Sequence, residues 1–512
     1  MKTIFKTLLV TSLTIGALTS CSKFEELNTN PDAAVNATAP MIATNLILNI
    51  TDNTISSGKS FLQPAMLGKT VLYTEFPEDY QYNYLGRASF DGLVVLTNVE
   101  KMIGYAQEGT EKNAYTALGK FIRAWKFYSL TMQVGDIPYS DALKGESDVI
   151  APKYDSQKDV FAGILKELDE ADQLFAKGAT FQGDPIYNGD VTKWRKMVNT
   201  FELQVLLSLY KKTSDTDLRV IERFKSIVAS RPIFQSNADN FQLVYSDKAN
   251  QRYPFYKLGN PSIIYPMVSQ VPVAILKDLQ DYRLFYYANP SSVQVAAGKA
   301  VSDYAAYIGT DPSMTYSDMT RIYTSKDYSA LNSRYTELPD SEPVYLLSYA
   351  MLKFMLAEAT LRGWISGTSV ETYYNEGITA AMKFTASHTP DNVLYHHNRV
   401  ITDAYIANYI SSDKVKLNGN TEQQLSQIIT QKYLSTFLQA PNNDAFYENR
   451  RTGYPKFPIN TASNNNTPAD KLPIRWLYPQ KELDYNTSQV KAAINSQYGG
   501  SDDFNQQMWL LK

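Results

Sequence analysis

The segment from residue 73 to residue 84 carries the side chains whose types and spacing most clearly suggest chemistry. It reads Tyr-Thr-Glu-Phe-Pro-Glu-Asp-Tyr-Gln-Tyr-Asn-Tyr and so combines aromatic rings with carboxylates. A tyrosine offers an apolar ring face for stacking and a hydroxyl for hydrogen bonding. Two carboxylates at a defined distance are the catalytic groups of most glycoside hydrolases. The segment therefore permits two interpretations, capture of a ligand by stacking or hydrolysis by paired acids.

The spacing of the tyrosines favours capture. Tyr80, Tyr82 and Tyr84 alternate, so an extended backbone would place their rings on one side. A second aromatic-rich segment lies far downstream, and we expect its tyrosines to converge with the first set on one exposed face. The alternative is an edge strand whose tyrosines pack inward as core. The predicted ligand-binding residues are Phe76, Tyr80, Tyr82, Tyr84, Tyr304, Tyr307 and Tyr316.

Catalysis and metal binding have weaker support. Acidic residues in a polar loop are mostly solvated, and the spacing of the carboxylates in the 73–84 segment is generic. The histidines are His388, His396 and His397, and neither a cysteine nor a helical His-x-x-x-His pair accompanies them. The sequence contains neither a glycine-rich phosphate loop nor a nucleophile elbow. We therefore expect a protein that is not an enzyme and that holds no metal or cofactor.

The N-terminal residues predict export and lipidation. Two lysines precede an apolar run over residues 8–18, which is shorter than the ~20 residues that a membrane-spanning helix needs. Residues 1–20 are therefore typical of a secretory signal peptide. Cys21, the one cysteine of the chain, ends a Leu-Thr-Ser-Cys motif that resembles the bacterial lipobox. We expect a lipid on Cys21 and a tether over residues 21–39, whereas the alternative is a secreted protein with an incidental cysteine.

The composition limits the possible partners. The chain has 512 residues and a formal net charge of −3, and it has no basic stripe, so nucleic acid is not an expected partner. With a single cysteine the chain cannot form an internal disulfide, and its stability must come from buried core. Tyrosine is unusually common, with 37 residues against 22 phenylalanines, which favours a wet recognition surface.

The elements that must hold these loops are predicted to be helices in antiparallel pairs. Apolar residues recur at helical spacing, and capping residues mark many of the ends. The predicted helices span residues 40–50, 61–73, 91–106, 112–134, 156–178, 190–209, 217–229, 271–283, 344–363, 368–386, 402–410 and 421–438. Eight of them form four pairs of tetratricopeptide size, and such pairs normally stack into a superhelical scaffold.

The helix predicted over residues 344–363 is apolar on every side, so we expect it inside the molecule. Glu358 lies within it and needs a partner there, for which Arg362, Arg450 and Arg451 are the candidates. We interpret such a pair as fixing the fold rather than as a catalytic acid. The tryptophans that we expect to be structural are Trp125, Trp194 and Trp364.

One domain is predicted over residues 40–512. The helical scaffold covers about 91–229 and 343–440, and an irregular insert rich in Tyr, Pro, Asn and Ser covers about 231–340. A further irregular part covers about 441–512. Long irregular segments within a compact protein usually serve a function, so we expect these segments to carry the ligand face.

Several motifs occur in a fixed order along nearly the whole chain. They are Cys21 with its acidic follower, Asn28-Thr29-Asn30-Pro31, the segment 135–142, the segment 356–364, the segment 444–455 and the segment 475–479. Together they resemble the SusD/RagB family of nutrient-binding lipoproteins of Bacteroidetes. The chain departs from the family where Leu356 stands in place of the arginine of a frequent Arg-Ala-Glu motif.

The resemblance implies an all-α protein in which four tetratricopeptide-like units support irregular ligand-binding loops. It also implies a lipid-anchored protein of the outer membrane, exposed at the cell surface. Such a protein captures oligosaccharides, or peptides as the alternative, and passes them to a SusC-like TonB-dependent transporter. A surface glycoside hydrolase and an adhesin are the rival classes.

Overall fold

The computed structural model describes residues 37–51 and 58–512. The predicted signal peptide, the predicted lipidation site Cys21 and most of the predicted tether lie outside the described residues. Within those two ranges, no helix is both long enough and apolar enough to cross a membrane.

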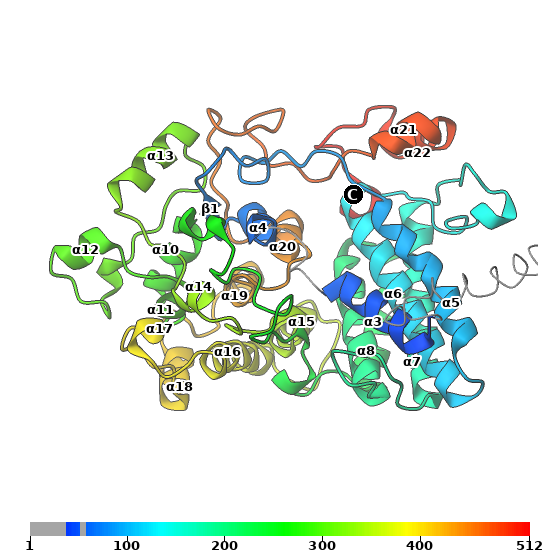
Figure 1. The fold of residues 1–512 in the computed structure, drawn as a ribbon, viewed down its shortest axis with the longest axis horizontal. Coiled ribbons are helices and arrows are strands. Elements are labelled where there is room, and N and C mark those ends of the chain that lie inside the picture. The colour runs from blue at the N-terminus through cyan, green and yellow to red at the C-terminus, as the bar shows by residue number, and fades with distance from the viewer. Residues whose placement is uncertain (1–36, 52–57) are drawn as a thin grey trace, which may run out of the picture.

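The first half of the chain forms one group of packed helices (Figure 1). Its members are α3 (Ala39–Thr51), α5 (Thr97–Tyr105), α6 (Thr110–Val134), α7 (Gln157–Lys177), α8 (Val191–Ser208) and α9 (Val220–Ser230). Helix α6 packs along α7, and α7 packs along α8. The Ser156 hydroxyl caps α7 by accepting from the Asp159 amide, and the Asp190 carboxylate caps α8, so both predicted starts are confirmed.

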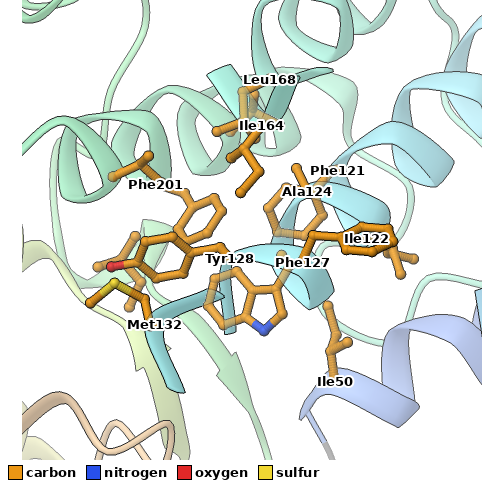
Figure 2. Close-up of a cluster of buried hydrophobic side chains, with 14 of the residues drawn as sticks. Ile50, Phe121, Ile122, Ala124, Phe127, Tyr128, Met132, Ile164, Leu168 and Phe201 are labelled. Atoms are coloured by element: carbon orange, nitrogen blue, oxygen red, sulfur yellow. The ribbon is translucent and has the colours of Figure 1, made fainter. Parts of the chain in front are cut away.

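Aromatic rings fill the centre of this group (Figure 2). The Trp125 ring lies 4.5 Å from the Phe201 ring, and the Trp194 ring stacks on the Phe175 ring at 5.9 Å. Trp125, Trp194 and Trp364 are all buried, which confirms the prediction that they are structural.

A second group of helices surrounds α15 (Tyr349–Leu361) and, apart from α4, comes from the second half of the chain. The other members are α4 (Gly58–Leu67), α16 (Val370–Ser387), α18 (Asp403–Ser411), α19 (Thr421–Ser435) and α20 (Asp444–Thr452). Helix α15 packs against α16 and α19 and also contacts α8, so it joins the two groups. Its burial confirms the predicted interior helix, and Glu358 pairs with both Arg362 and Arg451 as predicted. Arg450 instead donates to the carbonyls of Met132 and Ile474.

Short strands replace parts of two predicted helices. Residues Val344–Leu347 form β4, which pairs antiparallel with β2 (Phe241–Leu243), and Ser348 then caps α15. Likewise α4 ends at Leu67, and Val71–Tyr73 form β1, which pairs antiparallel with β3 (Pro266–Val268). In both places, apolar residues that suit a buried helix also suit a buried strand, and a remote partner decides between them.

Two predicted helix starts also need correction. Residues Asp91–Leu96 form the 3₁₀ helix η1, and Asp91 makes no side-chain cap. At α16 the capping residue is Ser369, whose hydroxyl accepts from the Thr372 amide, and not Thr368. Such boundaries depend on a single turn of backbone and are poorly fixed by sequence patterns.

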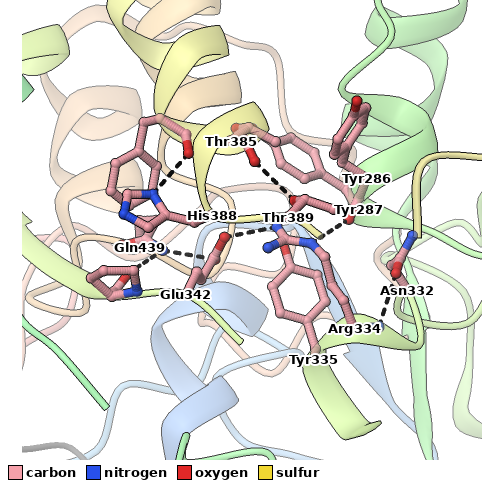
Figure 3. Close-up of polar contacts among 12 residues, drawn as sticks. Tyr286, Tyr287, Asn332, Arg334, Tyr335, Glu342, Thr385, His388, Thr389 and Gln439 are labelled. Atoms are coloured by element: carbon pink, nitrogen blue, oxygen red, sulfur yellow. Dashed lines mark hydrogen bonds and ion pairs between the residues drawn. The ribbon is translucent and has the colours of Figure 1, made fainter. Parts of the chain in front are cut away.

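The segment predicted to be mostly irregular contains more helix than expected. Its elements are η4 (Asn237–Asp239), η5 (Pro261–Ile264), α10 (Gln270–Asp278), α11 (Leu284–Tyr287), α12 (Ser292–Ala296), η6 (Tyr304–Ala306), α13 (Tyr316–Ser325) and α14 (Arg334–Glu337). A buried ion pair of 2.7 Å joins Arg334 to Glu342, and Gln439 donates to Glu342 at 2.8 Å (Figure 3). This buried polar cluster connects the segment to Gln439, which follows α19 in the second helical group.

Helix α17 (Val393–His396) packs against α11. The part predicted to be irregular over about 441–512 contains α20 and, after residue 479, α21 (Gln480–Tyr485), α22 (Thr487–Tyr498) and η7 (Trp509–Leu511), so that prediction needs correction. Helices α21 and α22 pack on each other at the end of the molecule near α6 (Figure 1). The predicted all-α class is confirmed, since the few strands are at most four residues long.

Candidate ligand-binding face

The segment that follows β1 folds into turns and is neither the extended segment nor the edge strand predicted above. The Tyr82 amide donates to the Glu78 carbonyl at 3.1 Å, and the Tyr84 amide donates to the Asp79 carbonyl at 2.8 Å. Asn83 has a φ of 62°, which turns the chain back on itself. The alternating spacing of the tyrosines therefore does not place their rings on one side. We call residues 74–84 the aromatic loop.

The rings of the aromatic loop take different positions. Tyr82 is buried, with 4% of its surface exposed, so the prediction of an exposed ring there is wrong. Tyr80 is half-buried, and its hydroxyl accepts a hydrogen bond from Trp476 at 3.2 Å. Phe76 and Tyr84 are exposed by 57% and 41%. Phe76 and Tyr84 thus remain available to a ligand.

The downstream tyrosines do not all converge with the aromatic loop. The Tyr316 hydroxyl does reach it and donates to the Glu75 carbonyl at 2.8 Å. Tyr304 and Tyr307 instead pack on Phe285 of α11, with ring centroids 4.8 and 5.0 Å away. Tyr307 is completely buried, so the prediction of an exposed ring is wrong here too.

Replacing Tyr307 by phenylalanine is expected to lower the free energy of unfolding by about 1 kcal/mol, because the Tyr307 hydroxyl donates to the Val301 carbonyl at 2.9 Å. Ligand binding should not change. Chemical denaturation measures the first effect, and Tyr485→Phe on the exposed ring of α21 is the matched control. A weaker ligand affinity with unchanged stability would contradict the structural role of Tyr307.

Four tyrosines from three distant segments form a row of rings that the sequence prediction missed. The Tyr73 ring lies 5.5 Å from that of Tyr265, which stacks at 6.3 Å on Tyr323, which stacks at 5.8 Å on Tyr328. Tyr73 is buried, and the other three are half-buried. We call this row the tyrosine ladder. It arises because β1 pairs with β3 and α13 covers both strands, through Met319 against Leu72 and Met267.

Two lysines sit against these rings. The Lys326 ammonium lies 4.0 Å from the centre of the Tyr323 ring, and the Lys59 ammonium lies 5.9 Å from the ring centres of Tyr73 and Phe76. Cation–π attraction of this kind holds a ring in place. Burial raises the pKa of Tyr328 to about 12, so its hydroxyl stays protonated at neutral pH and can donate as well as accept.

A groove of about 550 Å³ lies next to the loop that leads into α13. Asp311 and Pro312 of that loop form one wall, and α10 and residues 455–458 form the others. The lining is mainly apolar, with Val271, Ile275 and Phe457, and its charged members are Asp311 and Lys456. Apolar walls with a few polar groups are typical of small-molecule sites.

The carboxylates of the aromatic loop are engaged separately. Glu75 accepts a hydrogen bond of 2.8 Å from the Tyr73 hydroxyl, and Glu78 forms a 3.0 Å ion pair with Lys59. Asp79 is exposed. Across the described ranges, no three His, Cys, Asp or Glu side chains lie close enough to share a metal ion. The arrangement suits stacking and hydrogen bonding to a neutral ligand.

A scaffold of helix pairs that carries a face of half-exposed tyrosines defines a helical binding protein. Its family follows from comparison, because the model of a SusD-like family, described as starch-binding and associating with the outer membrane, matches residues 31–479. The chain therefore belongs to the SusD-like family, as the order of its motifs predicted. No protein among the curated sequences matches it.

Solved structures agree with this assignment. A SusD homolog from Bacteroides fragilis is 43% identical, and the match covers 93% of this chain and 100% of that one with a TM-score of 0.89. An outer-membrane protein from Bacteroides vulgatus, whose description names nutrient binding, is 36% identical. This match also covers 93% of this chain and 100% of that one, with a TM-score of 0.82. A chitin-binding SusD homolog from Flavobacterium johnsoniae is 19% identical, covers 93% and 98%, and shares the fold with a TM-score of 0.72. The tetratricopeptide-like scaffold that we predicted is confirmed.

Proposed function

We propose that this protein captures oligosaccharides on the tyrosine ladder and the neighbouring Phe76, and that it passes them to a SusC-like TonB-dependent transporter. A lipid on Cys21 holds it on the outer membrane at the cell surface, and residues 40–512 act as one domain. The observation that carries this proposal is the row of half-exposed, stacked tyrosines beside an exposed phenylalanine. Membership of a family described as starch-binding supports it.

The chemistry of the face suits a sugar. The C–H faces of sugar rings stack on aromatic rings, while tyrosine hydroxyls exchange hydrogen bonds with sugar hydroxyls. The ladder presents both features, since Tyr265, Tyr323 and Tyr328 are each partly open to solvent. Because the face is open, each contact contributes modestly and the affinity for a short oligosaccharide is expected to be weak.

Peptide capture is the second candidate, and the groove beside α10 favours it. Its walls combine apolar side chains with one acid, Asp311, and one base, Lys456, which suits a peptide better than a sugar. A titration with both chitohexaose and mixed tripeptides separates the two candidates. Release of shortened sugars from chitohexaose would instead support the interpretation of the protein as a glycoside hydrolase.

Replacing Tyr323 by alanine is expected to weaken chitohexaose binding about tenfold, which corresponds to about 1.4 kcal/mol. The reason is that Tyr323 contributes an inner ring of the ladder, between Tyr265 and Tyr328. Isothermal titration calorimetry measures the effect, with chitohexaose as the first probe because a relative of the same fold binds chitin. Maltohexaose is titrated in parallel.

The matched control for this titration is Tyr485→Ala, since Tyr485 is 84% exposed on α21, outside the ladder. Equal affinities for the wild type and for Tyr323→Ala, with circular dichroism showing both folded, would contradict the ladder as the binding site. Co-purification of a large β-barrel protein from outer membranes tests the transporter partner, and mass spectrometry of the N-terminal peptide tests the lipid.

A further inference from the structure

A buried lysine lies beneath the aromatic loop. Lys69 connects α4 to β1 with a φ of 56°, and 2% of its surface is exposed. Its amine donates to the Gln81 carbonyl at 2.7 Å and to the Tyr80 carbonyl at 3.4 Å. Among residues 37–51 and 58–512, no carboxylate lies within ion-pair distance of this amine. A buried lysine without a carboxylate partner is unusual, because burying a charged amine is costly.

The two acceptors belong to consecutive residues of the turn that shapes the aromatic loop. The Tyr80 carbonyl accepts only a long bond of 3.4 Å from the Asn83 amide, and no backbone amide of the described residues donates to the Gln81 carbonyl, so the amine of Lys69 supplies the short bond. A neutral amine has two N–H donors, which matches the two carbonyls that it faces. The Gln81 side chain also accepts from the Tyr73 amide at 2.8 Å, so the same turn is fastened to the strand that carries the first ring of the ladder.

We propose that Lys69 is the positioning residue of the aromatic loop, and that the loop opens with uptake of a proton by its amine. When the loop is closed, Lys69 holds the turn over residues 79–83, which lies between Phe76 and Tyr84 in the aromatic loop. When the loop opens, the amine meets water and becomes an ammonium group. The link to ligand capture rests on the proposed function, whereas the closure itself does not.

Proton linkage fixes the direction of the effect. Burial lowers the pKa of Lys69 to about 7, against an ordinary value of 10.5 in water. Between these two values the open loop binds more protons than the closed loop, so closure strengthens as the pH rises from about 7. For one proton, the closing equilibrium changes by at most about tenfold per pH unit. Below about pH 7 both states are protonated and closure is at its weakest.

The other ionisable groups around Lys69 leave its amine without a charged partner. On α4, Lys59 pairs with Glu78 of the aromatic loop at 3.0 Å. Asp79 is exposed on the same loop. From α19, the Tyr433 hydroxyl donates to the Lys69 carbonyl at 3.2 Å rather than to its amine. From α20, Asp444 lines a small cavity with Thr70, and burial raises its pKa to about 7, so it is mostly ionised above that pH. The pH response of the loop between pH 7 and pH 9 is therefore assigned to Lys69.

Hydrogen exchange of the aromatic loop, followed by mass spectrometry on the purified chain, tests the proposal. After correction for intrinsic exchange, protection of the peptide over residues 74–84 should rise at least tenfold between pH 7 and pH 9. In Lys69→Met, protection at pH 9 should be at least tenfold lower and independent of pH. Lys126→Met is the matched control, because Lys126 of α6 is a half-buried lysine whose pKa is also lowered by burial and whose amine donates to a neutral oxygen, Asn49 Oδ1 of α3, at 2.6 Å.

Constant or falling protection of the wild-type loop between pH 7 and pH 9 would overturn the proposal. This measurement uses the wild-type protein alone, so it does not depend on whether a variant folds. A folded Lys69→Met with wild-type protection would overturn it as well. Chitohexaose affinity is measured across the same pH range. A loop that tightens while the affinity stays constant would uphold the role of Lys69 and count against the aromatic loop as part of the ligand face.

Discussion

Glu358→Gln is expected to lower the free energy of unfolding by about 3–5 kcal/mol, because it breaks a buried ion pair between α15 and α20. The Glu358 carboxylate meets both terminal nitrogens of Arg451, at 2.5 and 2.7 Å, and the side chains are exposed by only 1% and 6%. Arg362 contacts the same carboxylate at 2.7 Å. The neutral amide would leave buried guanidinium charge with too little compensation.

The protonation state of Glu358 agrees with this role. Burial by itself would raise its pKa, but the charge and the hydrogen bonds of Arg451, together with the charge of Arg362, lower the pKa below its ordinary value. The stabilisation is therefore present above the ordinary carboxyl pKa and is lost as the pH falls below it. Chemical denaturation at pH 7 measures the cost of the substitution.

Glu222→Gln provides the matched control for Glu358→Gln, since Glu222 pairs with Arg219 on the surface of α9. Surface pairs contribute little, so its denaturation midpoint should stay unchanged. A wild-type midpoint for Glu358→Gln would show that the pair does not stabilise the fold. Loss of ligand binding in a fully stable Glu358→Gln would point to a functional carboxylate instead.

Trp194→Ala is also expected to cost about 3–5 kcal/mol of folding free energy. Trp194 is completely buried at the centre of the first helical group, and its ring stacks on Phe175 and meets Phe121 edge-on at 5.4 Å. Its indole N–H also donates to Asp184 at 2.8 Å. The substitution removes a large ring and leaves a cavity that packed helices cannot fill.

The variant Trp194→Phe separates the two contributions of this side chain. It keeps an aromatic ring and loses the hydrogen bond to Asp184, which still accepts from the amides of Tyr187 and Gly189. We therefore expect it to cost less than half as much as Trp194→Ala in chemical denaturation. Equal costs for the two variants would show that the hydrogen bond, and not the volume of the ring, dominates.

Features that depend on local patterns were predicted well from the sequence. The caps at Ser156 and Asp190 follow from the residue types that satisfy free amides at a helix start. The interior position of α15 follows from its apolar faces, and the pairing of Glu358 with Arg451 follows from the cost of a buried charge. Each of these features can be predicted from a short stretch of sequence or from a single large energetic cost.

The ligand face depends on contacts between remote segments, which periodicity does not reveal. Tyr265 and Tyr73 become neighbours only because β1 pairs with β3, and Tyr323 joins them only because α13 packs over both strands. Tyr82 and Tyr307 have the same residue type and a similar loop context, yet they are buried. Tyrosine content therefore predicted that such a face exists but did not predict which rings form it.

Hydroxyl-radical footprinting with and without saturating chitohexaose tests most directly whether the tyrosine ladder holds the ligand. The method reports the solvent exposure of individual aromatic side chains by mass spectrometry. We predict protection of Phe76, Tyr265 and Tyr323 in the complex and no change at Tyr485. Protection confined to residues outside the ladder, with Tyr265 and Tyr323 oxidised as in the free protein, would contradict the account.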